Sequence, residues 1–164
     1  MQRLMTAIRW LNIGSATLAS AMMVLMMLHI TLDVANRYFF NGQIVGTLEV
    51  VSFYYMVALV FLAFGFVELK HENIRVDLFA QMMPRPVQFA LYLLACVLGL
   101  IFFGMLFWQT LHDAIRATGS GEEAMSNFRF IIWPSRWSLP IGFAAAFLAV
   151  MANLLTSVSQ RKAL

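Results

Sequence analysis

Charge is scarce in this sequence of 164 residues. Asp, Glu, Lys and Arg together make up 12% of the chain, whereas apolar residues make up 62%. Mean hydropathy is +0.79, far above the value expected for a water-soluble domain of this length. The composition therefore excludes a soluble globular protein and predicts an integral membrane protein.

Cysteine is nearly absent, and so are the motifs of common catalytic and metal sites. The one cysteine, Cys96, lies inside an apolar run, which excludes a disulfide framework and a thiolate metal site. The chain has no Ser/His/Asp set, no phosphate-binding glycine loop, and no HExxH or CxxC motif. We therefore predict no enzyme activity, no metal and no other cofactor. The net charge of +3 is spread over dispersed basic residues, which argues against a nucleic-acid partner.

Long apolar runs are what the chain does contain. Residues 10–32, 48–69, 87–111 and 137–158 are each long enough to cross about 30 Å of hydrocarbon as a helix. In the fourth run, Gly142 and several alanines give one smooth face. No linker or repeat divides the chain, so residues 1–164 are expected to form a single membrane domain. The predicted fold class is all-α, with four transmembrane helices.

The distribution of Lys and Arg predicts the orientation. Seven lie in the leader, the second connection and the tail, against four in the other two connections. Because basic residues favour the cytoplasmic side, both termini are expected there. The four on the opposite, outer side are Arg37, Arg116, Arg129 and Arg136.

The second connection has two interpretations. Ile74, Leu78 and Met82 recur at a spacing of four, which favours a short helix lying on the cytoplasmic surface and ending before Pro84. A plain loop is the alternative. Two polar residues within the spans, Asn12 and Asn153, are expected to form hydrogen bonds between helices.

A polar island, residues 33–49, separates the first two spans. Asp33 and Arg37 are four residues apart, so a continuing helix places them on one stripe. Tyr38, Asn41 and Glu49 follow. Two interpretations of Arg37 stand: it contacts a docked partner at the outer face, or it pairs internally with Asp33 or Glu49.

Two other classes of function remain open from the residues alone. His29 and His112 lie near the outer ends of spans one and three, so a haem- or quinone-linked membrane anchor is one alternative. We favour a hydrogen bond from His29 to Asp33 instead. The second alternative is a small oligomeric transporter that uses Glu49 as its ion-carrying carboxylate. Since no charge lies in the middle of any span, a subunit of a larger assembly is the preferred interpretation.

Several segments carry a family resemblance along nearly the whole chain. They are DVANRYFFN after the first span, the Glu of GTLEV, HENIRVDLF with Pro84 after the second span, and WSLPIG opening the fourth. On these segments the sequence resembles the small membrane subunit (Q subunit, DctQ-like) of tripartite ATP-independent periplasmic (TRAP) transporters.

The resemblance implies a non-catalytic scaffold in the bacterial inner membrane. Such subunits pair with a large, many-span subunit that carries the substrate and sodium sites, and a periplasmic binding protein delivers an organic acid. By position, Asp33, Arg37, Asn41 and Glu49 match the family's outer motif, and Tyr38 lies beside them. The inner segment that would brace the large subunit contains His71, Arg75, Asp77 and Pro84. Trp133 and Trp137 are expected at the membrane interface, where they contact lipid or a partner.

Overall fold

Four long helices dominate the computed structural model, which describes residues 2–70, 84–124 and 129–160. The first is α1 (Gln2–Phe40); the second runs without interruption through α2 (Thr47–Val50), the π-helix η1 (Val51–Tyr55) and α3 (Met56–Leu69). The third is α5 (Arg85–Ser120), and the fourth joins the short α6 (Trp133–Arg136) to α7 (Ser138–Gln160). Each of the four is long and apolar enough to cross a membrane. The predicted all-α membrane fold is confirmed.

Two of these helices extend well beyond the predicted spans. At 39 and 36 residues, α1 and α5 are about 58 and 54 Å long, whereas the hydrocarbon core is about 30 Å thick. The third span was predicted to end at residue 111, but α5 continues to Ser120, and Ala114 and Ala117 are buried in this extension. Gly121, with a φ of 62°, then ends the helix in the left-handed conformation that favours glycine.

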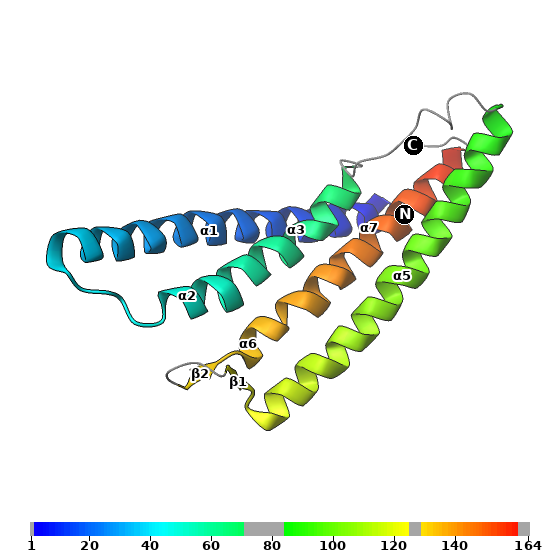
Figure 1. The fold of residues 1–164 in the computed structure, drawn as a ribbon. Coiled ribbons are helices and arrows are strands. Elements are labelled where there is room, and N and C mark those ends of the chain that lie inside the picture. The colour runs from blue at the N-terminus through cyan, green and yellow to red at the C-terminus, as the bar shows by residue number, and fades with distance from the viewer. Residues whose placement is uncertain (1, 71–83, 125–128, 161–164) are drawn as a thin grey trace.

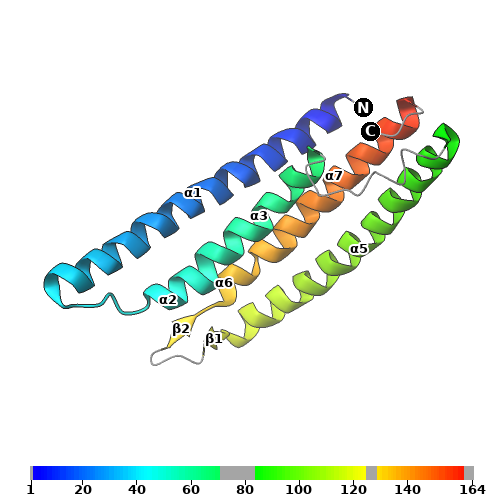
Figure 2. The ribbon, with the colours of Figure 1, turned by 45° about the horizontal axis from the view of Figure 1, so that its top comes forward.

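A short hairpin follows α5. Strand β1 (Glu123–Ala124) pairs antiparallel with β2 (Phe130–Ile131), and α6 begins two residues later. Figures 1 and 2 show the four helices side by side in the order α1, α3, α7, α5. Both termini lie at one end of this row (Figure 2). The opposite end, called the loop end below, carries the 41–46 connection and the hairpin.

Helix α7 lies at the centre of the row and packs against both α3 and α5. Its alanines at positions 145, 146, 149 and 152 are fully buried. A Cβ added to Gly142 would collide with the backbone carbonyl of Phe61 in α3. Small residues of this kind let helix backbones approach closely in lipid, where packing rather than water exclusion drives association.

The remaining fold predictions stay predictions. The surface helix expected over residues 74–83 lies outside the described residues. The shared end of the two termini follows from an even number of crossings, and its assignment to the cytoplasm is not tested by the structure. The same holds for the single-domain prediction.

Candidate functional site

The carboxylate of Asp33 organises the α1 side of the loop end. Asp33 is buried; its Oδ2 accepts a hydrogen bond from Arg37 Nε at 2.8 Å and lies 2.7 Å from Nη2 in the same ion pair. Its Oδ1 accepts the backbone N–H of Ile44 at 2.8 Å. The predicted internal pair of Arg37 with Asp33 is therefore present. The carboxylate also binds a backbone donor eleven residues further on, which draws the following connection back against the helix.

The connection makes this return through two left-handed residues. Asn41, directly after the end of α1, has a φ of 49°, and Gly46, directly before α2, has a φ of 91°. Asn and Gly are the residues that adopt this conformation most readily. Thr47 Oγ1 then donates to the carbonyl of Ile44 at 3.1 Å. As a result the C-terminal end of α1 projects beyond the start of α2 (Figure 1).

Aromatic side chains cover this projecting tip. Tyr38, Phe39 and Phe40 are each more than 70% exposed, and the Tyr38 and Phe39 rings contact edge to face with centroids 5.1 Å apart. Exposed aromatic rings at this height suit headgroups or a partner protein. Arg37 lies in the same stretch and keeps 55% of its side chain exposed although its head is paired.

The structure corrects the prediction for His29. Its Nδ1 lies 3.5 Å from the Tyr55 hydroxyl, and the two rings meet edge to face; the predicted partner, Asp33, binds Arg37 and Ile44 instead. His29 lies about one helical turn before Asp33 on the same side of α1 and contacts η1, whereas Asp33 contacts the connection. His112 packs against the ring of Trp108, with centroids 5.0 Å apart. His29 and His112 belong to α1 and α5, the two outer helices of the row, and α3 and α7 lie between these helices (Figure 2).

The π-helix η1 joins α1 to the hairpin. Tyr55 points to His29 of α1, whereas the neighbouring Tyr54 donates its hydroxyl to the carbonyl of Ile131 at 2.8 Å. The Phe130 ring of β2 contacts the Tyr54 ring edge to face, with centroids 5.7 Å apart, and lies tilted against the Phe53 ring at 6.3 Å. Single π-turns often occur at functional sites. Here the two consecutive tyrosines of the π-helix contact different elements, α1 and the hairpin. The contact of Tyr54 attaches the hairpin to the second helix of the row.

The two predicted interfacial tryptophans, Trp133 and Trp137, are half-buried at the start of the fourth helix. Trp137 Nε1 donates to Thr118 Oγ1 of α5 at 3.1 Å, so it links α7 to the end of α5. Trp133 opens α6. Contact of their exposed edges with lipid or a partner remains a prediction.

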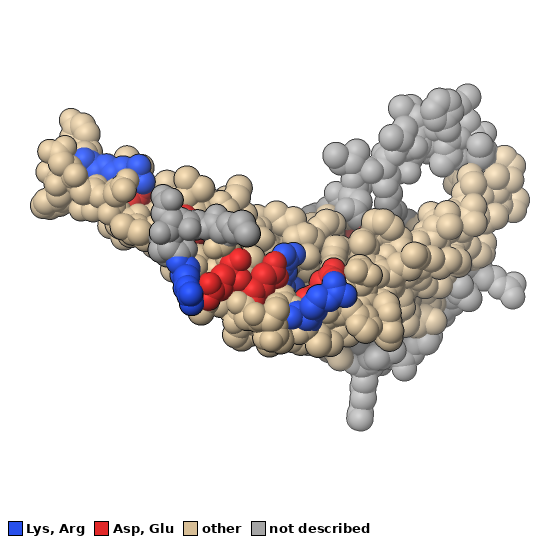
Figure 3. Space-filling view, turned by 60° about the horizontal axis from the view of Figure 1, so that its bottom comes forward, with Lys and Arg blue, Asp and Glu red and all other residues tan. Residues whose placement is uncertain are grey.

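A second polar group at the loop end was not predicted from the sequence. We call it the charged edge; it consists of Asp113, Arg116, Glu122, Glu123, Arg129 and Arg136, from α5, the hairpin and α6. Figure 3 shows a cluster of blue and red side chains near the middle of the view, and a smaller, separate group at the left tip. The sequence feature that could have predicted this group is the presence of three acidic residues and three arginines between positions 113 and 136.

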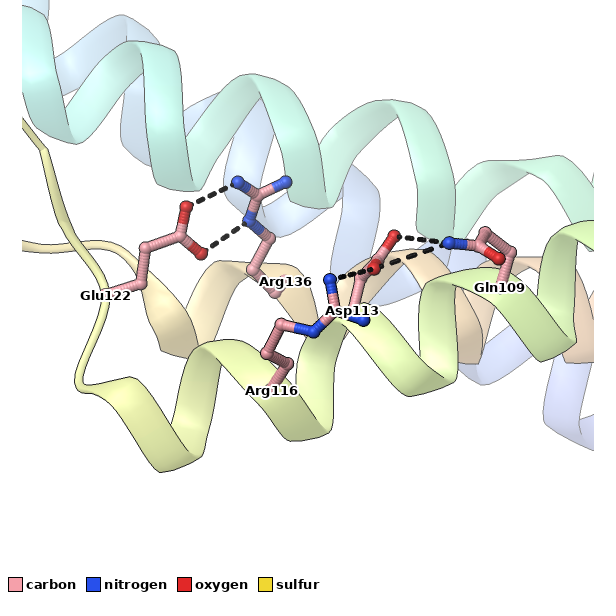
Figure 4. A network of polar contacts seen from close by, with 5 residues as sticks. All are labelled: Gln109, Asp113, Arg116, Glu122 and Arg136. Atoms are coloured by element: carbon pink, nitrogen blue, oxygen red, sulfur yellow. Dashed lines mark hydrogen bonds and ion pairs between the residues drawn. The ribbon is translucent and has the colours of Figure 1, made fainter.

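The pairs within the charged edge differ in tightness. Arg136 Nη2 and Nε bind the two oxygens of Glu122 at 2.7 and 3.2 Å, which clamps the start of the hairpin to α6 (Figure 4). Arg116 lies 4.0 Å from Asp113, a residue that also contacts Gln109 at 3.4 Å (Figure 4). Arg129 lies 3.9 Å from Glu123.

Most of the predicted inner motif lies outside the described residues; this applies to His71, Arg75 and Asp77. Pro84 is described and caps α5 in an extended conformation, accepting the backbone N–H of Val87 at 2.9 Å. Glu49 lies in the first turn of α2 at the loop end, half-buried, where the helix dipole favours an acid. The structure thus brings Asp33, Arg37, Tyr38, Asn41 and Glu49 to one end of the molecule.

The two intramembrane asparagines behave differently. Asn153 of α7 donates to the carbonyl of Glu68 at the end of α3 at 3.1 Å, so the predicted hydrogen bond between helices is present. Asn12 instead donates within its own helix, to Ile8 at 2.9 Å. Its Oδ1 is buried without a hydrogen-bond partner among the described residues, at the point where α1, α3 and α7 meet and where a Cβ on Gly65 would collide with it.

These features define a multi-pass helical membrane protein whose polar residues gather at the ends of its helices. A family profile for the DctQ component of tripartite ATP-independent periplasmic transporters matches residues 26–160. The chain belongs to this family and is a small, non-catalytic membrane subunit of a TRAP transporter. No curated protein and no solved structure matches the chain.

Proposed function

We propose that this subunit is a fixed scaffold. It binds the large, many-span subunit along its exposed apolar helices, and its loop end helps a soluble periplasmic substrate-binding protein to dock. The assembled transporter takes up an organic acid coupled to sodium across the bacterial inner membrane. The large subunit supplies the substrate and sodium sites, and this chain supplies surface and anchoring.

The exposed face of α5 is the observation that carries this proposal. One stripe of large apolar side chains along α5 is more than half exposed: Leu94, Leu98, Ile101, Phe102 and Met105. In the most apolar 18-residue stretch of α5, only 6% of the residues are buried within the chain. Such a stripe repeats every three to four residues and suits another helix or lipid. A row of helices, rather than a closed bundle, offers this face along its whole length.

The other outer helix offers a similar surface. Met23, Val24, Met27, Leu28 and Leu32 of α1 are all about half exposed or more. Together with the aromatic tip, they give α1 exposed apolar side chains from its middle to the loop end. A subunit that widens the anchored part of a larger transporter needs faces of this kind on both sides.

The alternative functions receive less support from the arrangement. A haem held between His29 and His112 requires adjacent helices, whereas α1 and α5 are the two outer members of the row. A transporter acting alone through Glu49 requires a carboxylate within the membrane, whereas Glu49 lies in the first turn of α2 at the loop end.

Affinity purification combined with site-specific crosslinking tests the scaffold. The tagged chain, carrying a photoreactive phenylalanine at Leu98 or Met105 of α5, is irradiated in native membranes and purified in mild detergent. We expect covalent products with one large hydrophobic protein. The matched control places the same group at Leu62 of α3, which is 5% exposed and faces the chain's own interior, and should give no such product.

Mass spectrometry of the purified material identifies the partner. Recovery of the chain alone, or only crosslinked to copies of itself, would overturn the scaffold proposal. A product from Leu62 equal to that from Met105 would show that the row seen here does not persist in the membrane.

A further inference from the structure

The arginines at the loop end fall into two groups that differ in how closely they are paired with a carboxylate and in how exposed they are. The head of Arg37 is bound at 2.7 and 2.8 Å by a carboxylate that is itself only 6% exposed. That carboxylate also holds the backbone of Ile44. The charge of Arg37 is therefore largely committed to holding the connection in place.

Arg116 and Arg129 are placed differently. Their side chains are 81% and 90% exposed, and their nearest carboxylates lie 4.0 and 3.9 Å away and are themselves 42% exposed. Exposed pairs at such distances contribute little to stability. Their charges can therefore turn toward a new partner at low cost.

The platform under these two arginines is nevertheless held by several contacts. The hairpin is tied to η1 by Tyr54 and Phe130, and to α6 by the tight pair of Glu122 with Arg136. The end of α5 is tied to α7 by Trp137. A charged surface presented on a fixed base loses little conformational entropy when a partner binds.

We infer that the charged edge is the main electrostatic contact of this subunit for the soluble subunit of the transporter, with Arg116 and Arg129 as its principal charges. The inference rests on the proposed function, since it assumes that a soluble partner docks at the loop end. It adds which surface of the chain receives that partner.

The pattern of charge favours a protein over an anionic membrane surface. Asp113 and Glu123 lie beside the two arginines, so the edge presents both signs at close spacing. A membrane surface rich in anionic lipid would attract the arginines and repel the acids. A folded protein with a matching mixed pattern satisfies both, and such complementarity acts chiefly on the association rate and orientation.

The test measures association of the purified soluble subunit with the complete membrane complex. The complex is reconstituted in nanodiscs of zwitterionic phosphatidylcholine, and the association rate is followed by biolayer interferometry at low and high salt. For the double substitution Arg116→Glu and Arg129→Glu we expect association about three- to tenfold slower at low salt. The difference should shrink at high salt because screening weakens exposed charges.

Three comparison variants separate docking from structure. Arg37→Glu should slow association less than the double substitution. The charge exchange Glu123→Arg with Arg129→Glu keeps an ion pair between the two positions but swaps the places of the positive and negative charge. It should therefore also slow association. Arg85→Glu, at the opposite end of α5, makes the same change in charge as Arg37→Glu, half that of the double substitution, and should leave association unaltered.

Each alternative outcome overturns a distinct claim. An unchanged rate for the double substitution, or a slowing only in discs that contain phosphatidylglycerol, would overturn the charged edge as a protein contact. Restoration of the normal rate by the charge exchange would show a structural role only. If the soluble subunit does not bind the unaltered complex at all, the docking part of the proposed function fails as well.

Discussion

Helices α7 and α5 are neighbours of similar apolar character, and yet they are used in opposite ways. Half of the residues in the most apolar stretch of the fourth helix, α6 with α7, are buried within the chain, compared with 6% in the most apolar stretch of α5, although the α5 stretch is the more hydrophobic of the two. The buried face of α7 consists mainly of Gly142 and alanines, with Phe143 and Val150 among them, whereas the exposed stripe of α5 consists of leucine, isoleucine, phenylalanine and methionine. Side-chain size, rather than hydropathy, separates the helix that packs inside the subunit from the helix that faces outward.

The physical reason lies in the solvent. Lipid tails are as apolar as leucine, so burying a large apolar side chain against another helix gains little from the hydrophobic effect. Close backbone approach gains dispersion contacts instead, and only small residues permit it. A smooth helix therefore collects neighbours from its own chain. A helix with large side chains leaves its surface to lipid or to another subunit.

The largest expected effect comes from adding one methyl group to α7. In Gly142→Ala, the new Cβ collides with the carbonyl of Phe61 and lies about 2.6 Å from its carbonyl carbon before any adjustment. Backbone atoms cannot escape by changing rotamer, so we expect a loss of about 1–3 kcal/mol in the free energy of unfolding. Thermal denaturation of the purified full chain in mild detergent measures it.

A glycine of α5 provides the matched control. A Cβ on Gly104 would meet only the Phe147 ring at 3.6 Å, an ordinary van der Waals distance. Gly104→Ala should therefore be neutral or stabilise the helix by up to about 1 kcal/mol. Equal losses at the two glycines would remove the contrast between the helices.

An intermediate effect is expected from the polar contact that ties α7 to α3. Asn153→Ala removes the hydrogen bond to the Glu68 carbonyl, and a hydrogen bond between membrane helices contributes about 0.6–2 kcal/mol. The same thermal assay applies. Thr156→Val on the next turn is the control, because the Thr156 hydroxyl bonds only to Ala152 of its own helix. A loss for Thr156→Val as large as that for Asn153→Ala would contradict a role for the bond between helices.

Hydropathy was sufficient to predict the four helices, and residue spacing offered the pair of Asp33 with Arg37 as one of two interpretations of Arg37. Both are local properties: a span depends on a run of apolar residues, and an ion pair on one helix depends on a spacing of four. The smooth face of the fourth span was also visible in the sequence. That it forms the centre of the row was not, because helix order depends on how all four faces fit together.

The rest of the loop end depends on partners distant in the sequence. The bond from Ile44 to Asp33 uses a backbone donor, which every residue but proline has, so no residue pattern announces it. The hydrogen bond of Tyr54 to Ile131 joins residues 77 positions apart. The expected partner of His29 was wrong for the same reason: Tyr55 comes from another helix, and only the packing of α1 on η1 brings it near.

The smallest expected effect on the chain itself comes from truncating the exposed face of α5. Leu98 is 57% exposed, so in the isolated subunit Leu98→Ala removes few internal contacts and should change the free energy of unfolding by less than about 0.5 kcal/mol. The same substitution at buried Leu62 of α3 leaves a cavity and should cost about 2 kcal/mol or more. Thermal denaturation of the two variants in the same detergent gives this comparison directly.

Leu98→Ala should have a larger effect when the large subunit is present than in the isolated subunit. If that subunit covers the α5 stripe, Leu98→Ala opens a gap at the interface, and less of the large subunit should be recovered with the tagged chain. Leu62→Ala would lower the yield of both subunits together and leave their ratio unchanged. An unaltered ratio for Leu98→Ala would indicate that lipid covers this part of α5, and would restrict the scaffold to α1 and the loop end. The ratio of the two subunits, measured beside the stability of the single chain, thus separates what α5 does inside the subunit from what it does in the assembly.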